Sequence, residues 1–186
     1  MIDRRRPPDL HLHISARPAL GEVARLLDNV DHHEPVNCLE DLTRVLEELC
    51  VCPRRSHSGS RRTLDLIGHS DDSRLLRLGE SVVDLGDDDV WSLFQRMASD
   101  RVLESLGIGE LRLLGCETAL SAEGQTTIRE LTRMLGIRVL GMSTPLYSAH
   151  FGRKGLKDRY ECLLRDATNL PGLDDDGAGD VRCDRL

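Results

Sequence analysis

The sequence predicts an α/β protein with a mostly parallel central sheet, and two short apolar runs carry that prediction. Residues 63–68 read Thr-Leu-Asp-Leu-Ile-Gly and residues 110–115 read Glu-Leu-Arg-Leu-Leu-Gly. Such runs, ending in glycine, are typical of buried strands in an α/β sheet. Aromatic residues make up only 3% of the chain. A core of Leu, Val and Ile in α/β layers is therefore favoured over an aromatic-rich β-sandwich.

The first part of the chain predicts one strand and two helices. Residues 10–14, Leu-His-Leu-His-Ile, alternate with the period of a strand. One helical face follows at Leu20, Val23, Leu27 and Val30. A second helix is expected over residues 39–50, where leucines recur at helical spacing after a capping pattern of Asn37 and Glu40.

The middle of the chain predicts a loop, a small hairpin and a helix. Residues 53–62 are rich in Arg, Ser and Gly and predict a polar loop. Residues 75–78 and 81–84 predict a hairpin or two short strands. Three aspartates at 87–89 favour a helix start through the helix dipole. Its buried side is predicted at Val90, Phe94 and Met97, and later at Leu103 and Leu106.

The last part predicts a helix over residues 122–135, stopped by Gly136, and a strand over 137–140. Residues 141–155 are expected to form a loop, and 159–164 a last strand. We expect residues 1–168 to form a single domain. Residues 169–186, with three consecutive aspartates, predict an acidic, flexible tail.

Composition excludes several classes of function. The formal net charge is −7 at pH 7, which gives no basic surface for nucleic acid. No stretch approaches the roughly 18 apolar residues of a membrane span, and no apolar signal segment follows the N-terminal arginines. We therefore expect a cytoplasmic protein without a membrane partner. The six cysteines form no Cys-x-x-Cys pair, so neither a metal nor another cofactor is expected.

The two predicted strand ends carry the candidate chemistry. His69 directly follows the first run and Cys116 the second. Parallel strands present their carboxyl ends at one edge of a sheet, where catalytic groups collect. A cysteine nucleophile needs its thiolate, which a neighbouring imidazole can generate. The alternative is a turn histidine and a small buried cysteine.

The order of these elements resembles that of caspase-like cysteine peptidases: caspases, gingipains, legumains and the CHAT-type bacterial caspase-like domains. The resemblance covers roughly residues 60–150 and rests on the strand before His69, the segment 74–79 and the Leu-Leu-Gly context of Cys116. It implies a three-layer sandwich with a mostly parallel sheet flanked by helices. It also implies cleavage of a partner protein, as in bacterial antiphage defence or regulated-death systems.

The resemblance also implies roles for individual residues. Cys116 would be the nucleophile and His69 its proton partner, while the backbone N–H groups of Ser70 and Cys116 would stabilise the oxyanion. The loop 141–155 would build the substrate pocket. Its candidate substrate-binding residues are Ser143, Thr144, Tyr147 and His150. The sequence names neither a preferred substrate residue nor an oligomeric state.

Three other functions compete with the peptidase. The family usually has His-Gly, whereas this chain has His69-Ser70, so a catalytically degenerate binding module is one alternative. A serine hydrolase would use Ser70 with His150, but position 72 lacks the glycine of a nucleophile elbow. A metal site would use the four histidines His11, His13, His32 and His33, which lack a convincing further ligand.

Overall fold

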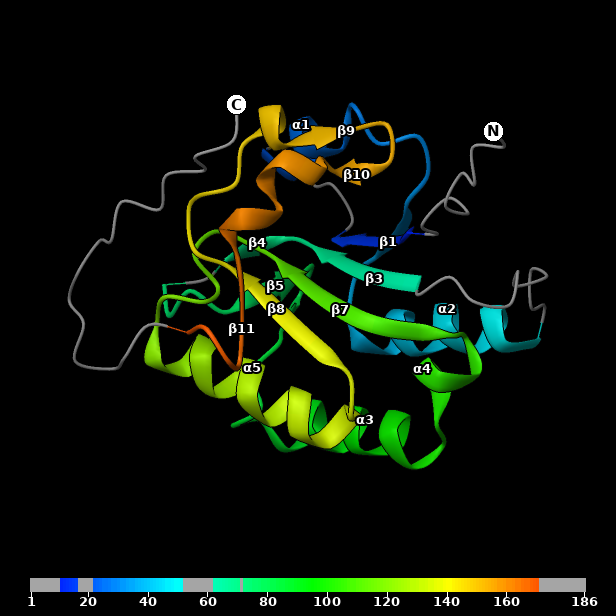
Figure 1. Cartoon of the computed structure of the whole chain (residues 1–186). Coiled ribbons are helices and arrows are strands. Elements are labelled where there is room, and N and C mark those ends of the chain that lie inside the picture. The colour runs from blue at the N-terminus through cyan, green and yellow to red at the C-terminus, as the bar shows by residue number, and fades with distance from the viewer. Residues whose placement is uncertain (1–10, 17–21, 52–61, 71, 171–186) are drawn as a thin grey trace, which may run out of the picture.

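The computed structural model describes residues 11–16, 22–51, 62–70 and 72–170. A six-stranded sheet lies at its centre (Figure 1). Neighbouring strands are parallel except at one edge, where β11 runs antiparallel to β8. In spatial order the strands are β2 (Glu34–Val36), β1 (His11–Ala16), β3 (Arg62–Ile67), β7 (Ile108–Leu114), β8 (Arg138–Met142) and β11 (Leu164–Asp166). The predicted mostly parallel α/β sheet is confirmed.

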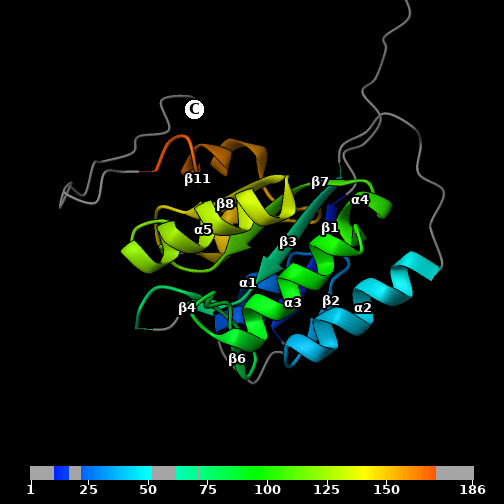
Figure 2. The ribbon, with the colours of Figure 1, turned by 90° about the horizontal axis from the view of Figure 1, so that it is seen from below.

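Four helices cover one side of the sheet, called here the lower face (Figure 2). They are α2 (Leu39–Val51), α3 (Asp88–Ser99), α4 (Val102–Ser105) and α5 (Ala122–Leu135). Their apolar stripes pack on leucines of the central strands in one continuous core. Helix α5 has the predicted bounds because Ser121 caps its first turn and Gly136 ends it in the left-handed conformation, φ 65°.

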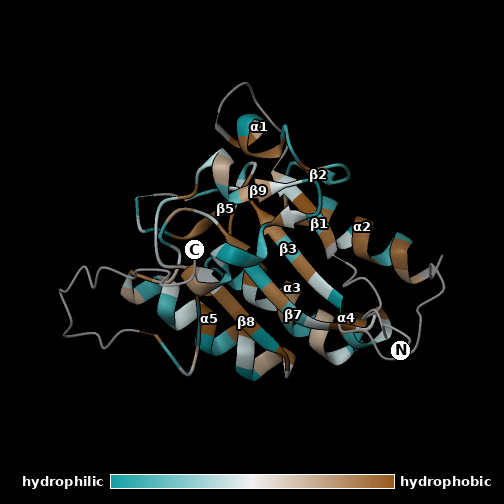
Figure 3. Ribbon diagram, turned by 45° about the horizontal axis from the view of Figure 1, so that its top comes forward, coloured by the Kyte–Doolittle hydropathy of each residue, from teal (hydrophilic) through white to brown (hydrophobic). Residues whose placement is uncertain are grey.

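The opposite side, the upper face, carries a thinner layer. It is made of α1 (Glu22–Leu27), the 3-10 helices η1 (Ser148–His150) and η2 (Asp158–Leu163), and the hairpin of β9 (Phe151–Gly152) and β10 (Gly155–Leu156). A second apolar core joins this layer to the carboxyl ends of the central strands. Figure 3 shows brown and teal segments alternating along β3 and β7, because their side chains point in turn to the two faces.

A separate three-stranded antiparallel sheet follows β3. It consists of β4 (His69–Ser70), β5 (Leu76–Leu78) and β6 (Ser81–Val82), with β5 in the middle. The predicted hairpin is therefore present as β5 and β6. The additional strand β4 pairs with β5 and carries His69 directly after the end of β3. This small sheet fixes the direction in which the chain leaves the central sheet.

The structure corrects three predicted elements. The helix predicted to run on to Leu106 breaks at Arg101, which has φ 53° and separates α3 from α4. The predicted loop 141–155 contains the end of β8, the helix η1 and the hairpin β9–β10. The strand predicted over 159–164 is mostly the 3-10 helix η2, and β11 begins only at Leu164.

Parts of two predicted segments lie outside the described residues. Of the polar loop 53–62 only Arg62 is described, and of the tail only Asn169 and Leu170. The side-chain oxygen of Asn169 accepts a hydrogen bond from the N–H of Asp166 at 2.7 Å. Within the described part of the chain, every helix is too short or too polar to span a membrane.

Candidate functional site

The two predicted strand ends lie side by side. Strands β3 and β7 are adjacent and parallel, with Ile67 opposite Leu114. The N–H of Gly68 donates to the carbonyl of Leu114 at 3.1 Å, so the pairing continues one residue beyond β3. His69 directly follows Gly68, and Cys116 lies two residues beyond Leu114. The adjacency expected from the sequence is therefore present.

Close packing explains the glycine that precedes each candidate residue. A Cβ on Gly68 would overlap the backbone carbonyl oxygen of Arg77 in β5. A Cβ on Gly115 would lie 2.8 Å from the hydroxyl oxygen of Ser70 and 3.0 Å from a methyl carbon of Leu76. Both positions need glycine because the small sheet β4–β6 packs directly against the ends of β3 and β7.

Ser70 joins the two strand ends. Its hydroxyl donates to the backbone carbonyl of Cys116 at 2.6 Å, so the side chain of Ser70 connects the histidine side to the cysteine side. The neighbouring His69 is exposed and pairs with Arg77 across the small sheet.

The sulfur of Cys116 has a backbone donor. The N–H of Leu146 approaches Sγ at 3.3 Å, from the chain that follows β8. Such a donor stabilises negative charge that develops on sulfur when a thiol loses its proton. Cys38 and Cys50 are also free, part-buried thiols among the described residues. The sulfur of Cys50 lies 3.3 Å from the hydroxyl of Ser105.

Two predicted substrate-binding residues hold the same chain segment in place. The buried hydroxyl of Ser143 donates to the carbonyl of Leu163 at 2.8 Å. The carbonyl of Thr144 accepts from the N–H of Glu117 at 3.1 Å. The Oγ1 of Thr144 is buried and has no hydrogen-bond partner among the described residues. Thr144 therefore contacts the cysteine loop, while the hydroxyl of Ser143 is used within the fold.

The other two predicted substrate-binding residues, Tyr147 and His150, form an aromatic surface next to Leu146. Tyr147 is 59% exposed, and its N–H donates to Nδ1 of His150 at 3.3 Å. The ring of His150 lies between those of Tyr147 and Tyr160, with centroid distances of 5.5 Å and 4.6 Å. Burial and, second, the positive charge of Lys157 lower the pKa of His150. The neutral imidazole is thus the form that accepts this bond.

Residues that the sequence suggested for a serine hydrolase or for a metal site make other contacts in the structure. The hydroxyl of Ser70 points to Cys116, and Nδ1 of His150 accepts from Tyr147. His13 pairs with Asp65 at 3.0 Å, and Nδ1 of His33 lies 2.9 Å from the hydroxyl of Ser15. Across the described ranges no group of three or more His, Cys, Asp or Glu residues could hold a metal ion.

Sequence reasoning missed an ion pair beside Cys116. Nε of Arg74 lies 3.4 Å from the carboxylate of Glu117, the residue that follows the cysteine. Both residues are left-handed, with φ 62° and 58°. Opposite charges 43 positions apart carry no local signal, and neither residue is a glycine or asparagine that would suggest this conformation.

Comparison with family models, with curated proteins and with solved structures gave no match to this chain. The site is therefore interpreted from its own geometry.

Proposed function

We propose that the chain is a caspase-like cysteine endopeptidase in which Cys116 is the nucleophile and His69 carries the proton. One observation supports this proposal above all others. Neighbouring parallel strands end together, one continuing into His69 and Ser70 and the other into Cys116, and the Ser70 hydroxyl joins them at 2.6 Å. A thiol and an imidazole on adjacent strand ends are the two groups that covalent cysteine catalysis requires.

The order of elements supports the finer fold. After the histidine-bearing β4 come the rest of a small antiparallel sheet, the helices α3 and α4, and strand β7, which Cys116 follows two residues beyond its end. Helix α5 and strand β8 follow. This is the order on which the resemblance to caspase-like peptidases rests, and the glycines before His69 and Cys116 have a steric role in it.

The proposed reaction is acyl transfer to sulfur. The thiol of Cys116 gives its proton to His69, and Sγ attacks the scissile carbonyl carbon. The N–H groups of Ser70 and Cys116 stabilise the oxyanion. The C–N bond then breaks as His69 returns the proton to the leaving amine, which leaves a thioester on Cys116. Water hydrolyses this thioester and regenerates the thiol.

The substrate is a protein or peptide, so the decisive experiment uses proteins. A native bacterial lysate is incubated with the chain, and newly formed N-termini are identified by mass spectrometry. We expect cleavages that vanish with Cys116→Ala and slow by about 100-fold or more with His69→Ala, the usual effect of losing a general base. Cys50→Ala, which removes another part-buried free thiol, should leave them unchanged.

Labelling of the thiols separates an enzyme from a degenerate binding module. Brief iodoacetamide treatment near neutral pH should modify Cys116 before Cys38 and Cys50, and His69→Ala should slow that step. Preferential modification of Cys50, or a cleavage pattern identical in Cys116→Ala, would disprove the peptidase. Binding of a lysate protein without any cleavage would instead support the binding module.

A further inference from the structure

A carboxylate adjoins the proposed nucleophile and is neutralised by a residue of the same chain. Glu117 follows Cys116 directly, and its carboxylate pairs with Nε of Arg74 at 3.4 Å. Arg74 belongs to the segment between β4 and β5, so the pair links the histidine side of the site to the cysteine side. The side chain of Arg74 is 48% exposed and that of Glu117 is 30% exposed.

The backbone fixes the carboxylate at the cost of strain. In the described ranges only Arg74, Arg101 and Glu117 among non-glycine residues have a positive φ. The left-handed conformation is strained for such residues, because their Cβ comes too close to the backbone. The N–H of Glu117 donates to the carbonyl of Thr144 at 3.1 Å, which holds the residue in this conformation. Glu117 is therefore a positioned residue directly after Cys116.

Arg74 is the exchangeable member of the pair. It has the longer and more exposed side chain, and an ion pair with this exposure contributes little to stability. A cation from a bound peptide could replace it at little cost. An acidic side chain in the same place would be repelled by the negative charge of Glu117. Tyr147 adds an exposed ring, next to the Leu146 N–H that contacts Sγ of Cys116.

We propose that Glu117 selects substrates with Arg or Lys at the residue whose carbonyl Cys116 attacks, and that Arg74 occupies Glu117 until such a substrate binds. This inference rests on the proposed peptidase function and adds its substrate class. Glu117 is a specificity residue that contacts the substrate side chain, and Arg74 is an internal competitor for it.

The test uses tetrapeptide libraries with a fluorogenic C-terminal amide and a fixed last residue: Arg, Lys, norleucine or Glu. We expect kcat/KM to be at least about tenfold higher for Arg and Lys than for norleucine, and lowest for Glu. Glu117→Gln keeps the side-chain size and should reduce this preference to about threefold or less. Arg74→Ala should lower KM for the Arg library about two- to fivefold by removing the competitor.

A second pair in the chain gives a matched control. Arg101 is also left-handed, and its Nε lies 2.6 Å from the carboxylate of Glu104. This pair precedes the start of β7, whereas Cys116 follows the other end of that strand. Glu104→Gln removes the same kind of ion pair and should leave the ratio between libraries unchanged. Equal loss in Glu104→Gln and Glu117→Gln would show that the effect is general destabilisation, which overturns the inference.

A binding measurement separates failure of this inference from failure of the proposed function. Fluorescent peptides ending in Arg or norleucine are titrated into Cys116→Ala with Glu117 intact or changed to Gln. Cleavage without a basic preference overturns the inference alone. Glu117-dependent binding of the Arg peptide without cleavage by the unmodified protein overturns the peptidase and supports the selection of a basic side chain. Absence of both overturns both proposals.

Discussion

The two faces of the central sheet are built from different chemistry. On the lower face, Leu64, Leu66, Leu111 and Leu113 are at most 2% exposed and lie in one apolar core with the helices. On the upper face, the residues between these leucines include Asp65, which is 0% exposed, and Arg112, which is 5% exposed. Charged side chains are almost never this buried unless they are paired.

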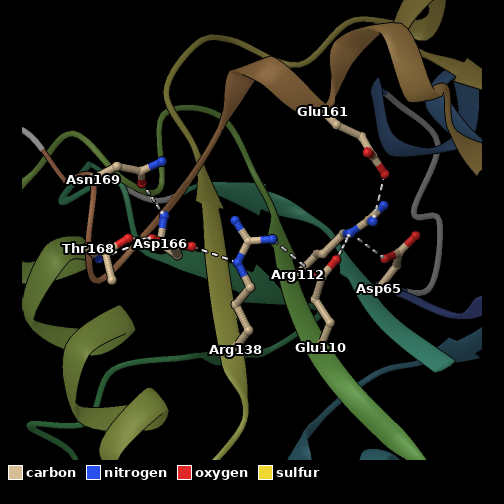
Figure 4. A network of polar contacts seen from close by, with 8 residues as sticks. All are labelled: Asp65, Glu110, Arg112, Arg138, Glu161, Asp166, Thr168 and Asn169. Atoms are coloured by element: carbon tan, nitrogen blue, oxygen red, sulfur yellow. Dashed lines mark hydrogen bonds and ion pairs between the residues drawn. The ribbon is translucent and has the colours of Figure 1, made fainter. Parts of the chain in front are cut away.

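The upper-face charges form a row across the strands, and Figure 4 shows the part of it around Asp65 and Arg112. His13, Asp65 and Arg112 occupy matching positions of β1, β3 and β7. Arg112 donates to Glu110 at 2.7 Å and to Glu161 at 2.8 Å, and its Nε lies 3.9 Å from Asp65. Burial would lower the pKa of Arg112, but the surrounding carboxylates outweigh burial and raise it.

This difference separates stability from specificity. Apolar burial on the lower face is non-directional and contributes about 25 cal/mol per Å². A buried charge row contributes little net stability, but it penalises any register in which a charge loses its partner. We infer that the upper face helps to align β3 with β7. That alignment is what brings the ends carrying His69 and Cys116 together.

The largest expected effect comes from breaking the charge row. Asp65→Ala leaves the buried His13 without its carboxylate and removes one of the three carboxylates around the buried Arg112. It should therefore lower the free energy of unfolding by about 3–5 kcal/mol. Urea denaturation followed by circular dichroism measures this change. If the row serves register rather than stability, Asp65→Leu combined with Arg112→Met should be more stable than Asp65→Leu alone.

The matched change on the lower face is Leu111→Ala. It should cost about 2–5 kcal/mol through a cavity, and replacing a second residue should not restore the loss. A loss of less than about 1 kcal/mol in Asp65→Ala would show that water or rearrangement satisfies the row, which contradicts the comparison of the two faces.

The sequence reveals the charge row only when the two runs are paired as neighbouring strands. The runs at 63–67 and 110–114 alternate polar and apolar residues in the same phase, with Asp65 and Arg112 at equivalent places. Pairing the two runs as parallel neighbours puts these opposite charges side by side, as the structure does. The apolar residues predicted the strands, whereas the role of the charges depends on the register between segments far apart in sequence.

Local signals explain which other elements were predictable. Helix α5 was predicted with its observed bounds because its cap residues lie within the segment. The break between α3 and α4 at Arg101 was not predictable, since neither Gly nor Pro marks it. The hairpin β9–β10 and η2 depend on packing against α1 and the upper face. Glu117 likewise needs contacts from Thr144 and Arg74 to adopt its conformation.

A smaller loss of stability is expected from a change at the edge of the upper face, where β11 joins the sheet. The carboxylate of Asp166 accepts from Thr168 at 2.6 Å and 3.0 Å and from Arg138 at 2.6 Å. These bonds, first that of the Thr168 side chain, lower the pKa of Asp166 below its usual 3.8. Folding therefore gains stability from Asp166 above about pH 4, and loses it as pH falls through the lower pKa of the folded state.

The corresponding variant is Asp166→Asn. It should reduce the free energy of unfolding by roughly 1 kcal/mol at pH 6, because the pair with half-exposed Arg138 is lost. The difference from the unmodified protein should shrink as pH is lowered from 5 to 3, when both proteins carry a neutral group there. Urea midpoints measured across this range provide the check, and a difference that grows on acidification would contradict the assignment.

The smallest expected effect is local and lies beside Cys116. The lowered pKa of His150 means that the folded state favours the neutral imidazole, whose Nδ1 accepts the N–H of Tyr147. The stabilisation is therefore complete above about pH 6.5 and is lost as pH falls through the lower pKa of the folded state. Protonation replaces the acceptor with a donor, so the bond to Tyr147 breaks.

We expect this break to cost a few tenths of a kcal/mol and to increase amide hydrogen exchange at Tyr147 between pH 7.5 and 5.5, after correction for the intrinsic rate. His150→Gln supplies an amide oxygen that does not titrate, so it should remove the pH dependence while keeping part of the protection. His33 also has a pKa lowered by burial, but it contacts Ser15. His33→Gln should therefore leave exchange at Tyr147 unchanged, and an equal effect of both variants would assign the pH dependence to the fold as a whole.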